Sequence, residues 1–307
     1  MPDPRYAPIA FFAYNRPEHT RRTLASLAAN PGAADSALYA FSDGPRTADA
    51  VTAVAEVRAL LRGLQGFSSV EVIERERNYG LAGSIVDGVG RLCASHGRVI
   101  VVEDDLLLSP HFLRYMNDGL ARYESEPRVA SIHGYTYPVD TLLPETFFMR
   151  GADCWGWATW ARAWAVFEPD AGELLRQLEA RKLGADFDFG GAAGNLSMLR
   201  NFIAGRNNSW AIRWHASAYL RDMLTLYPGR SLVRNIGHDG SGTHSGAVDA
   251  FDAGLTEQPV IVAPIEVAES PAARAAFGRY FRSLRVGLAQ RVLRRLRRIL
   301  GVAPKTA

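Results

Sequence analysis

The sequence predicts an α/β fold in which helices flank a mostly parallel sheet. Between residues 7 and 126, apolar segments of strand length alternate four times with segments of helix length, which is typical of a parallel sheet covered by helices. Polar residues follow each apolar segment, and the carboxyl ends of parallel strands form the ligand-binding edge of such sheets. A hydrophobic fraction of 48% and a charged fraction of 22% are typical of a globular protein.

Turn residues bound the first two strand–helix pairs. The apolar run APIAFFAY ends before a proline, and leucines then recur at helical spacing until a Pro-Gly pair. The run ALYAFS ends at Asp-Gly-Pro, and a segment with valines and leucines on one side follows. These patterns predict strands at 7–14 and 37–42 and helices at 17–30 and 47–64.

The next two pairs end in the most apolar part of the chain. SVEVIER reads as a strand, and glycines mark the helical segment after it. RVIVV is the most apolar run, and a helix that follows it has Ser109 as N-cap and Pro110 at its first position. We therefore expect strands at 69–75 and 98–102 and helices at 78–97 and 109–126.

The second half of the chain is less regular. Strands are expected at 131–138 and 145–151 and a helix at 171–184, while the segment GADCWGWATWARAW holds four of the six tryptophans. There is no internal repeat and no linker long enough to separate domains. We expect one domain over residues 1–269, divided near residue 125, and a separate tail over 270–307.

Charge separates that tail from the body. From Ser270 onward there are ten Lys or Arg residues and no Asp or Glu, whereas 25 basic and 32 acidic residues precede it. The body therefore carries about seven net negative charges although the whole chain carries +3. An acidic body repels nucleic-acid phosphates, so no nucleic-acid partner is expected.

The tail contains a basic amphipathic helix. Seven arginines lie between residues 282 and 301 around an apolar series at helical spacing. Such helices lie on anionic membrane surfaces, and docking on the acidic body or on a partner is the alternative. The apolar series is Leu284, Leu288, Val292, Leu296 and Ile299.

The sequence favours a cytoplasmic location. No stretch approaches the ~20 consecutive apolar residues of a membrane span, and the first residues lack the pattern of a signal peptide. Cys93 and Cys154 lack metal-ligand spacing and are too few for a disulfide framework. We expect a protein peripheral to the inner face of the cytoplasmic membrane.

Three carboxylates, Glu103, Asp104 and Asp105, directly follow the most apolar strand. Adjacent carboxylates repel one another, and their burial is costly unless a positive charge compensates. A hard divalent cation held by one or two carboxylates and by substrate phosphates supplies that charge. It also stabilises the charge of a leaving nucleoside diphosphate. A solvated acidic loop is the alternative.

The sequence resembles the GT-A glycosyltransferases, whose fold is Rossmann-like. It is most similar to the N-acetylglucosaminyltransferase I type and to bacterial family-2-like sugar transferases. VVEDDLLLSPHFLRYM resembles the Glu-Asp-Asp motif of that type. Four further segments agree in order, so that the resemblance covers about residues 8–245. They are AYNRPEHTRR, FSDG, RNYGLAGSI and RGADCWGWATWARAW.

The resemblance implies a nucleotide-sugar donor, most readily a UDP-sugar, with Mn²⁺ or Mg²⁺ as cofactor. It implies a glycan or lipid-linked acceptor in bacterial surface polysaccharide or lipopolysaccharide synthesis. Residues 1–125 would form the nucleotide-binding half and residues 126–269 the acceptor half. Asp105 would ligate the metal, and Glu103 and Asp104 would face sugar or ribose hydroxyls. The other implied residues are Arg16, Asp43, Arg77, Asn78 and Gly80 for the nucleotide sugar and Trp155 and Trp157 for the acceptor.

The sequence departs from the family at the expected catalytic base. The eukaryotic family places an Asp directly after a Trp in the second half, where this chain has Ala211. An inverting transferase needs a carboxylate or His to take the acceptor proton. Asp153 is the first candidate, and Asp239 and His244 are the next. A retaining mechanism, which needs no such base, stays open.

Two other classes of protein compete with this interpretation. A nucleotidyltransferase on a related sheet would need a glycine-rich loop after the first strand, and AYNRPEH has no glycine there. The other competitor is a non-enzymatic membrane adaptor that uses its basic tail.

Overall fold

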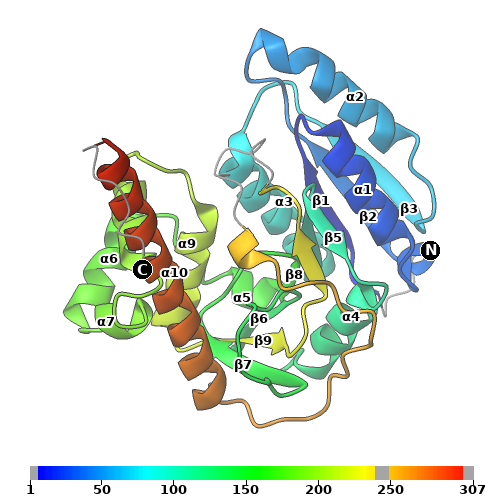
Figure 1. Cartoon of the computed structure of the whole chain (residues 1–307). Coiled ribbons are helices and arrows are strands. Elements are labelled where there is room, and N and C mark those ends of the chain that lie inside the picture. The colour runs from blue at the N-terminus through cyan, green and yellow to red at the C-terminus, as the bar shows by residue number, and fades with distance from the viewer. Residues whose placement is uncertain (1–5, 239–248, 300–307) are drawn as a thin grey trace.

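An eight-stranded sheet runs through the structure (Figure 1). The computed structural model of the chain describes residues 6–238 and 249–299, with the surroundings of side chains described as far as residue 285. The strands of the sheet are β1 (Ile9–Ala13), β2 (Ala37–Ser42), β3 (Ser69–Glu74), β4 (Arg98–Glu103), β6 (Val129–His133), β7 (Thr146–Arg150), β8 (Trp157–Trp160) and β9 (Leu224–Pro228).

The strands follow the order β3-β2-β1-β4-β8-β6-β9-β7. The pairs β3–β2, β2–β1, β1–β4 and β6–β9 are parallel, and β8 and β7 run antiparallel to their neighbours. β1 is buried along its whole length, as expected of a parallel strand covered on both faces. The predicted α/β class with a mostly parallel sheet is therefore confirmed.

The order of the first strands creates a switch point. The chain passes from β1 outward to β2 and β3 and then returns to place β4 on the other side of β1. Open α/β sheets bind ligands at the carboxyl ends of the strands beside such a point. Arg16 follows β1 and Glu103 ends β4, and the segments after these strands pack together, since Thr23 of α1 donates to the Asp104 carbonyl at 2.8 Å.

Helices cover the sheet and form a smaller group beside it (Figure 1). In that group, α6, α7, α8 and α9 enclose an apolar cluster that includes Leu178, Phe187 and Leu199. The helices are α1 (Pro17–Ala28), α2 (Val51–Arg62), α3 (Gly80–His96), α4 (Phe112–Arg122), α5 (Ala161–Trp164), α6 (Ala171–Ala180), α7 (Gly184–Phe187), α8 (Asn195–Ile203), α9 (Trp210–Leu220) and α10 (Pro271–Ile299). Short 3₁₀ turns lie at Ala33–Asp35, Ala48–Ala50 and Asp249–Phe251.

The helix α10, orange to red in Figure 1, docks its first turns on the body. Phe277 is buried against Phe147 and Tyr227, and Arg274 forms ion pairs with Asp186 and Glu269. The helix predicted for the basic tail is thus present, and its beginning is part of the fold. No helix among the described residues has the length and apolar character needed to span a membrane.

Two elements differ from the sequence-based prediction. The helix expected from Ser109 begins at Phe112, and the Ser109 N–H instead donates to the Leu232 carbonyl at 2.9 Å. Leu106–Leu108 just before it form a strand, β5, antiparallel to β10 at Val233–Asn235. The tryptophan-rich segment contributes β8, which lies between β4 and β6. Both differences come from pairing between segments far apart in the chain, which local periodicity does not reveal.

Candidate functional site

The acidic triplet forms the turn between β4 and β5. Glu103 is the last residue of β4 and Leu106 is the first of β5, so Asp104 and Asp105 make the turn itself. The backbone N–H of Ile236 donates to the Asp105 carbonyl at 2.8 Å, directly beyond the β5–β10 pairing. The two strand pairs on either side fix the backbone that carries the three carboxylates.

Arg16 joins the end of β1 to this turn. Its Nη1 donates to Asp105 Oδ2 at 3.1 Å, and the two side chains are 17% and 22% exposed. The backbone N–H of Tyr14 donates to Asp104 Oδ2 at 3.3 Å. The structure therefore brings Arg16, Asp104 and Asp105 together across the switch point, as the sequence led us to expect.

Burial dominates the electrostatics of the triplet. It raises the pKa of Glu103 well above its usual value, with further increases from the charges of Asp105 and Asp104. Burial, followed by the Asp105 charge, raises the pKa of Asp104 to about 7, against the opposing effects of the Tyr14 N–H and Arg16. Burial also raises the pKa of Asp105, although Arg16 and two histidines act against it. The positive charge nearby therefore does not offset the cost of ionising these carboxyls.

Sequence reasoning missed two residues of the loop that closes over the triplet. A Cβ atom on Gly237 would lie 2.2 Å from Asp105 Oδ2 and 3.0 Å from Arg16 Nη1, so a larger residue here would displace these two side chains. The next residue, His238, attracts Asp105 electrostatically, as does His19. No local pattern could have placed this loop beside Asp105, because the β5–β10 pairing carries it there.

The carboxylate of Asp43 is bonded to the start of α3. It accepts the backbone N–H groups of Tyr79 and Gly80, each at 2.8 Å, and that of Gly44 at 3.0 Å. Asn78 donates from its side chain to the Gly44 carbonyl at 2.7 Å. Asp43, Asn78 and Gly80 thus form one cluster that braces the ends of β2 and β3. Their binding to a nucleotide stays a prediction.

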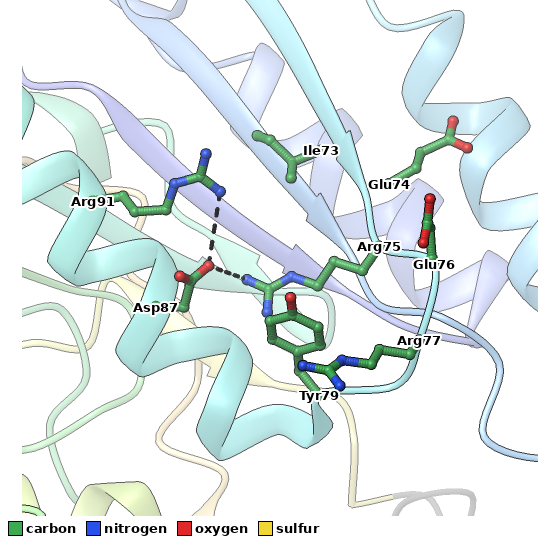
Figure 2. Close-up of a pocket in the computed structure, with 8 residues that line it drawn as sticks. All are labelled: Ile73, Glu74, Arg75, Glu76, Arg77, Tyr79, Asp87 and Arg91. Carbon is green, nitrogen blue, oxygen red and sulfur yellow. Dashed lines mark hydrogen bonds and ion pairs between the residues drawn. The ribbon is translucent and has the colours of Figure 1, made fainter.

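The Arg77 side chain lines a hollow of about 400 Å³ at the edge strand β3 (Figure 2), while its backbone packs closely against Gly44 beside this cluster. Figure 2 shows Asp87 paired with both Arg75 and Arg91, and the Arg75 guanidinium lies 4.1 Å from the centre of the Tyr79 ring. The lining contains acids as well as arginines and none of the triplet, so the hollow offers no clear excess of positive charge for a phosphate.

Two tyrosines hold the candidate base Asp153. Its Oδ2 accepts the Tyr137 hydroxyl at 2.9 Å and the Tyr227 hydroxyl at 3.3 Å, and its Oδ1 accepts the backbone N–H of Cys154 at 2.9 Å. Burial, and then the Asp153 charge, raises the pKa of both phenols well above the usual value. Both hydroxyls therefore remain protonated and donate to Asp153.

The charges of Asp153 and of the triplet both act on the thiol of Cys154. Burial raises the pKa of Cys154 well above its usual value, and the charges of Asp153, Glu103 and Asp105 raise it further. Trp155 connects the same regions, since its ring centroid lies 5.5 Å from that of His238. The other candidate bases, Asp239 and His244, lie outside the described residues.

The two tryptophans expected to bind an acceptor have different surroundings. Trp155 is partly buried and packs edge-on against Tyr135. Trp157 has no exposed surface and stacks on Trp210, with ring centroids 5.5 Å apart. The Trp157 ring is therefore a core residue without an open face for a sugar. Ala211 lies in the first turn of α9 and packs against the same core.

The carboxyl oxygens of the triplet are of the type that a hard divalent ion prefers, and substrate phosphates would complete its coordination. Within residues 6–238 and 249–299 no group of three or more His, Cys, Asp and Glu side chains is arranged to hold a metal ion. Ions of the Mg²⁺ type are bound through one or two carboxylates together with substrate phosphates and water, so they need no closed cage. Asp105, whose side chain is partly exposed, is the residue that would hold such an ion.

Comparison with known proteins finds only distant structural likeness. No protein-family model matches the chain, and no curated protein matches its sequence. A mannosyltransferase, PcManGT from Pyrobaculum calidifontis in complex with GDP-Man and Mn²⁺, is 16% identical with a TM-score of 0.31, over 45% of this chain and 38% of that one. TarS from S. aureus is 16% identical with a TM-score of 0.29, over 48% of this chain and 24% of that one. The chain spans less than half of either structure, and likeness this weak carries no functional argument.

Replacement of Asp43 by Ala is expected to destabilise the protein by about 2 kcal/mol, because the backbone N–H groups of Gly44 and Tyr79 lose their side-chain acceptor and Gly80 keeps only Asn78 Oδ1. Urea denaturation would measure the change in the free energy of unfolding. Asp49→Ala is the matched control, since Asp49 is exposed. Equal stability of the two variants would contradict the bracing role.

Asp104 should make the stability of the metal-free protein depend on pH. Its pKa is about 7 in the folded state and about 3.9 when unfolded, so the folded state binds more protons between these values. The free energy of unfolding should therefore fall as pH rises from about 4 to 7.

Asp104→Asn should remove that part of the decline, while Asp49→Asn should not. Urea denaturation at a series of pH values, in buffer without divalent ions, compares the curves. Parallel curves for wild type and Asp104→Asn would show that this carboxyl does not titrate as described.

Proposed function

We propose that the chain is a metal-dependent glycosyltransferase that uses a nucleoside diphosphate sugar. The observation that carries the proposal is the acidic turn Glu103-Asp104-Asp105 at the end of β4, opposite Arg16 at the switch point of the sheet. A carboxylate and an arginine at this place suit a divalent ion and a phosphate chain respectively. Nothing in a purely structural turn would require three carboxyls whose burial is so unfavourable.

In this proposal the donor lies over the carboxyl ends of β1 and β4. Arg16 pairs with the diphosphate, and Glu103 and Asp104 accept hydrogen bonds from sugar or ribose hydroxyls. Asp43, Arg77, Asn78 and Gly80 lie on the nucleotide side, with a UDP-sugar as the preferred donor. A bound Mn²⁺ or Mg²⁺ on Asp105 would neutralise charge on the departing diphosphate.

The acceptor lies on the other side of the triplet, over the loop that carries Asp153 and Trp155. The carboxylate of Asp153 takes the proton of the acceptor hydroxyl as that oxygen attacks the sugar. Donated hydrogen bonds from Tyr137 and Tyr227 keep the carboxylate oriented. Trp155 offers a partly exposed ring on which a sugar can stack.

The basic tail favours an acceptor at a membrane. The helix α10 is docked through its first turns, and the arginine-rich sequence that follows suits anionic lipid headgroups. We therefore propose a lipid-linked or glycan acceptor of bacterial surface polysaccharide or lipopolysaccharide synthesis, used at the inner face of the cytoplasmic membrane.

Calorimetric titration of UDP and GDP, with and without Mn²⁺, tests the donor site. One nucleotide should bind in a metal-dependent way, and Asp105→Ala should weaken it by about 10- to 100-fold, as expected when an interaction with a charged group is lost. Asp118→Ala, an exposed acid on α4, is the control and should bind normally.

Tight binding that needs no metal would contradict the role of Asp105. Preference for a nucleoside triphosphate over both diphosphates would favour the nucleotidyltransferase alternative. Absence of any nucleotide binding would favour the membrane adaptor.

Deletion of residues 282–307 should reduce co-sedimentation with vesicles that contain anionic lipid, because it removes most of the basic residues of the tail. Nucleotide binding should be retained, since Phe277 and the docked turns remain. Vesicles of neutral lipid are the control and should bind the full chain weakly. Unchanged sedimentation with anionic vesicles would rule out this membrane contact.

A further inference from the structure

The same carboxylate oxygen serves two expected partners. Asp105 Oδ2 accepts Arg16 Nη1 at 3.1 Å, and it is also an oxygen available to a divalent ion. Gly237 closes over both groups, because a Cβ atom there would lie 2.2 Å from this oxygen and 3.0 Å from Nη1. The Arg16 guanidinium therefore occupies a position beside the oxygen to which a metal ion would bind.

Like charges make simultaneous occupancy unfavourable. A divalent ion bound to Oδ2 would stand close to the Arg16 guanidinium, and the site is partly enclosed, so water screens the repulsion incompletely. A bound phosphate would offer Arg16 an alternative partner. Arg16 occupies the N-cap position of α1, a twelve-residue helix whose N-terminus favours anions, and its planar fork matches a phosphate.

We propose that Arg16 is a resident counter-cation of Asp105 that exchanges with the metal. In the empty protein Arg16 neutralises Asp105, and when the metal and the nucleotide arrive together Arg16 leaves Asp105 and pairs with the diphosphate. Asp105 is thereby paired with Arg16 before the exchange and with the metal after it. The diphosphate, once bound, is paired with Arg16. This inference rests on the proposed function, because it takes Asp105 as the metal ligand.

The exchange couples metal and nucleotide. Metal alone must displace Arg16 without offering it a new partner, whereas metal with a diphosphate provides one. Each ligand therefore strengthens the binding of the other by the same factor, as linkage requires. An arginine that only oriented Asp105 for the metal would have the opposite effect, since its removal would weaken metal binding.

Titration with Mn²⁺ alone, followed by the electron paramagnetic resonance signal of the free ion, separates the two roles. Arg16→Gln should bind Mn²⁺ about tenfold more tightly than the wild type, within the usual range of coupling between sites. Addition of UDP or GDP should then increase Mn²⁺ affinity less in the variant than in the wild type. Arg16→Lys keeps a positive charge and should bind Mn²⁺ nearly as the wild type does.

Two controls make the outcome decisive. Arg21→Gln removes an exposed charge from the same helix, where Arg21 pairs with Glu18, and should leave Mn²⁺ affinity unchanged. Asp105→Ala should remove the Mn²⁺ binding that the wild type shows, both without and with a nucleotide. If it does so while Arg16→Gln binds Mn²⁺ no more tightly than the wild type, the exchange is wrong and the metal site stands. If Asp105→Ala binds Mn²⁺ as well as the wild type, both the exchange and the proposed metal site fail.

Discussion

The candidate site depends on one constraint, which is that three carboxyls lie side by side at the end of a buried strand. Burial raises the pKa of each of Glu103, Asp104 and Asp105, and such a turn persists only where its backbone is fixed from several sides. β4 pairs with β1, β5 pairs with β10, and the loop after β10 reaches back to the Asp105 carbonyl. These pairings also place Arg16 and Gly237 beside Asp105.

A second carboxylate is held in a different way. Asp153 has no cation bonded to it among the ion pairs of the described residues, and its oxygens instead accept two phenol hydroxyls and a backbone N–H. The Tyr137 ring is in turn enclosed by Phe277 and Phe281 from α10. The aromatic side chains that dock the C-terminal helix therefore also fix the hydroxyls around Asp153, which joins the tail to the site through packing.

The sequence predicted the features that depend on local pattern. Alternating strands and helices placed Arg16, Asp43 and the triplet at one edge of the sheet, and the structure has them there. It could not predict that Leu106 would enter a strand rather than precede a helix, because its partner β10 lies in a distant part of the chain. Gly237 was missed for the same reason. The fold class could be predicted from local sequence patterns, whereas the site depends on contacts between segments that are far apart in the chain.

The pairing of β5 with β10 also has a consequence for the order of events during synthesis. The acidic turn appears early in the growing chain, yet the strand and the glycine that complete it follow more than a hundred residues later. Long-range pairings of this kind form only after the intervening chain has been closed into a loop. A ribosome-bound chain that ends before Val233 can therefore carry all three carboxyls without the strand pairing that fixes their turn, so the geometry of the triplet belongs to the finished protein.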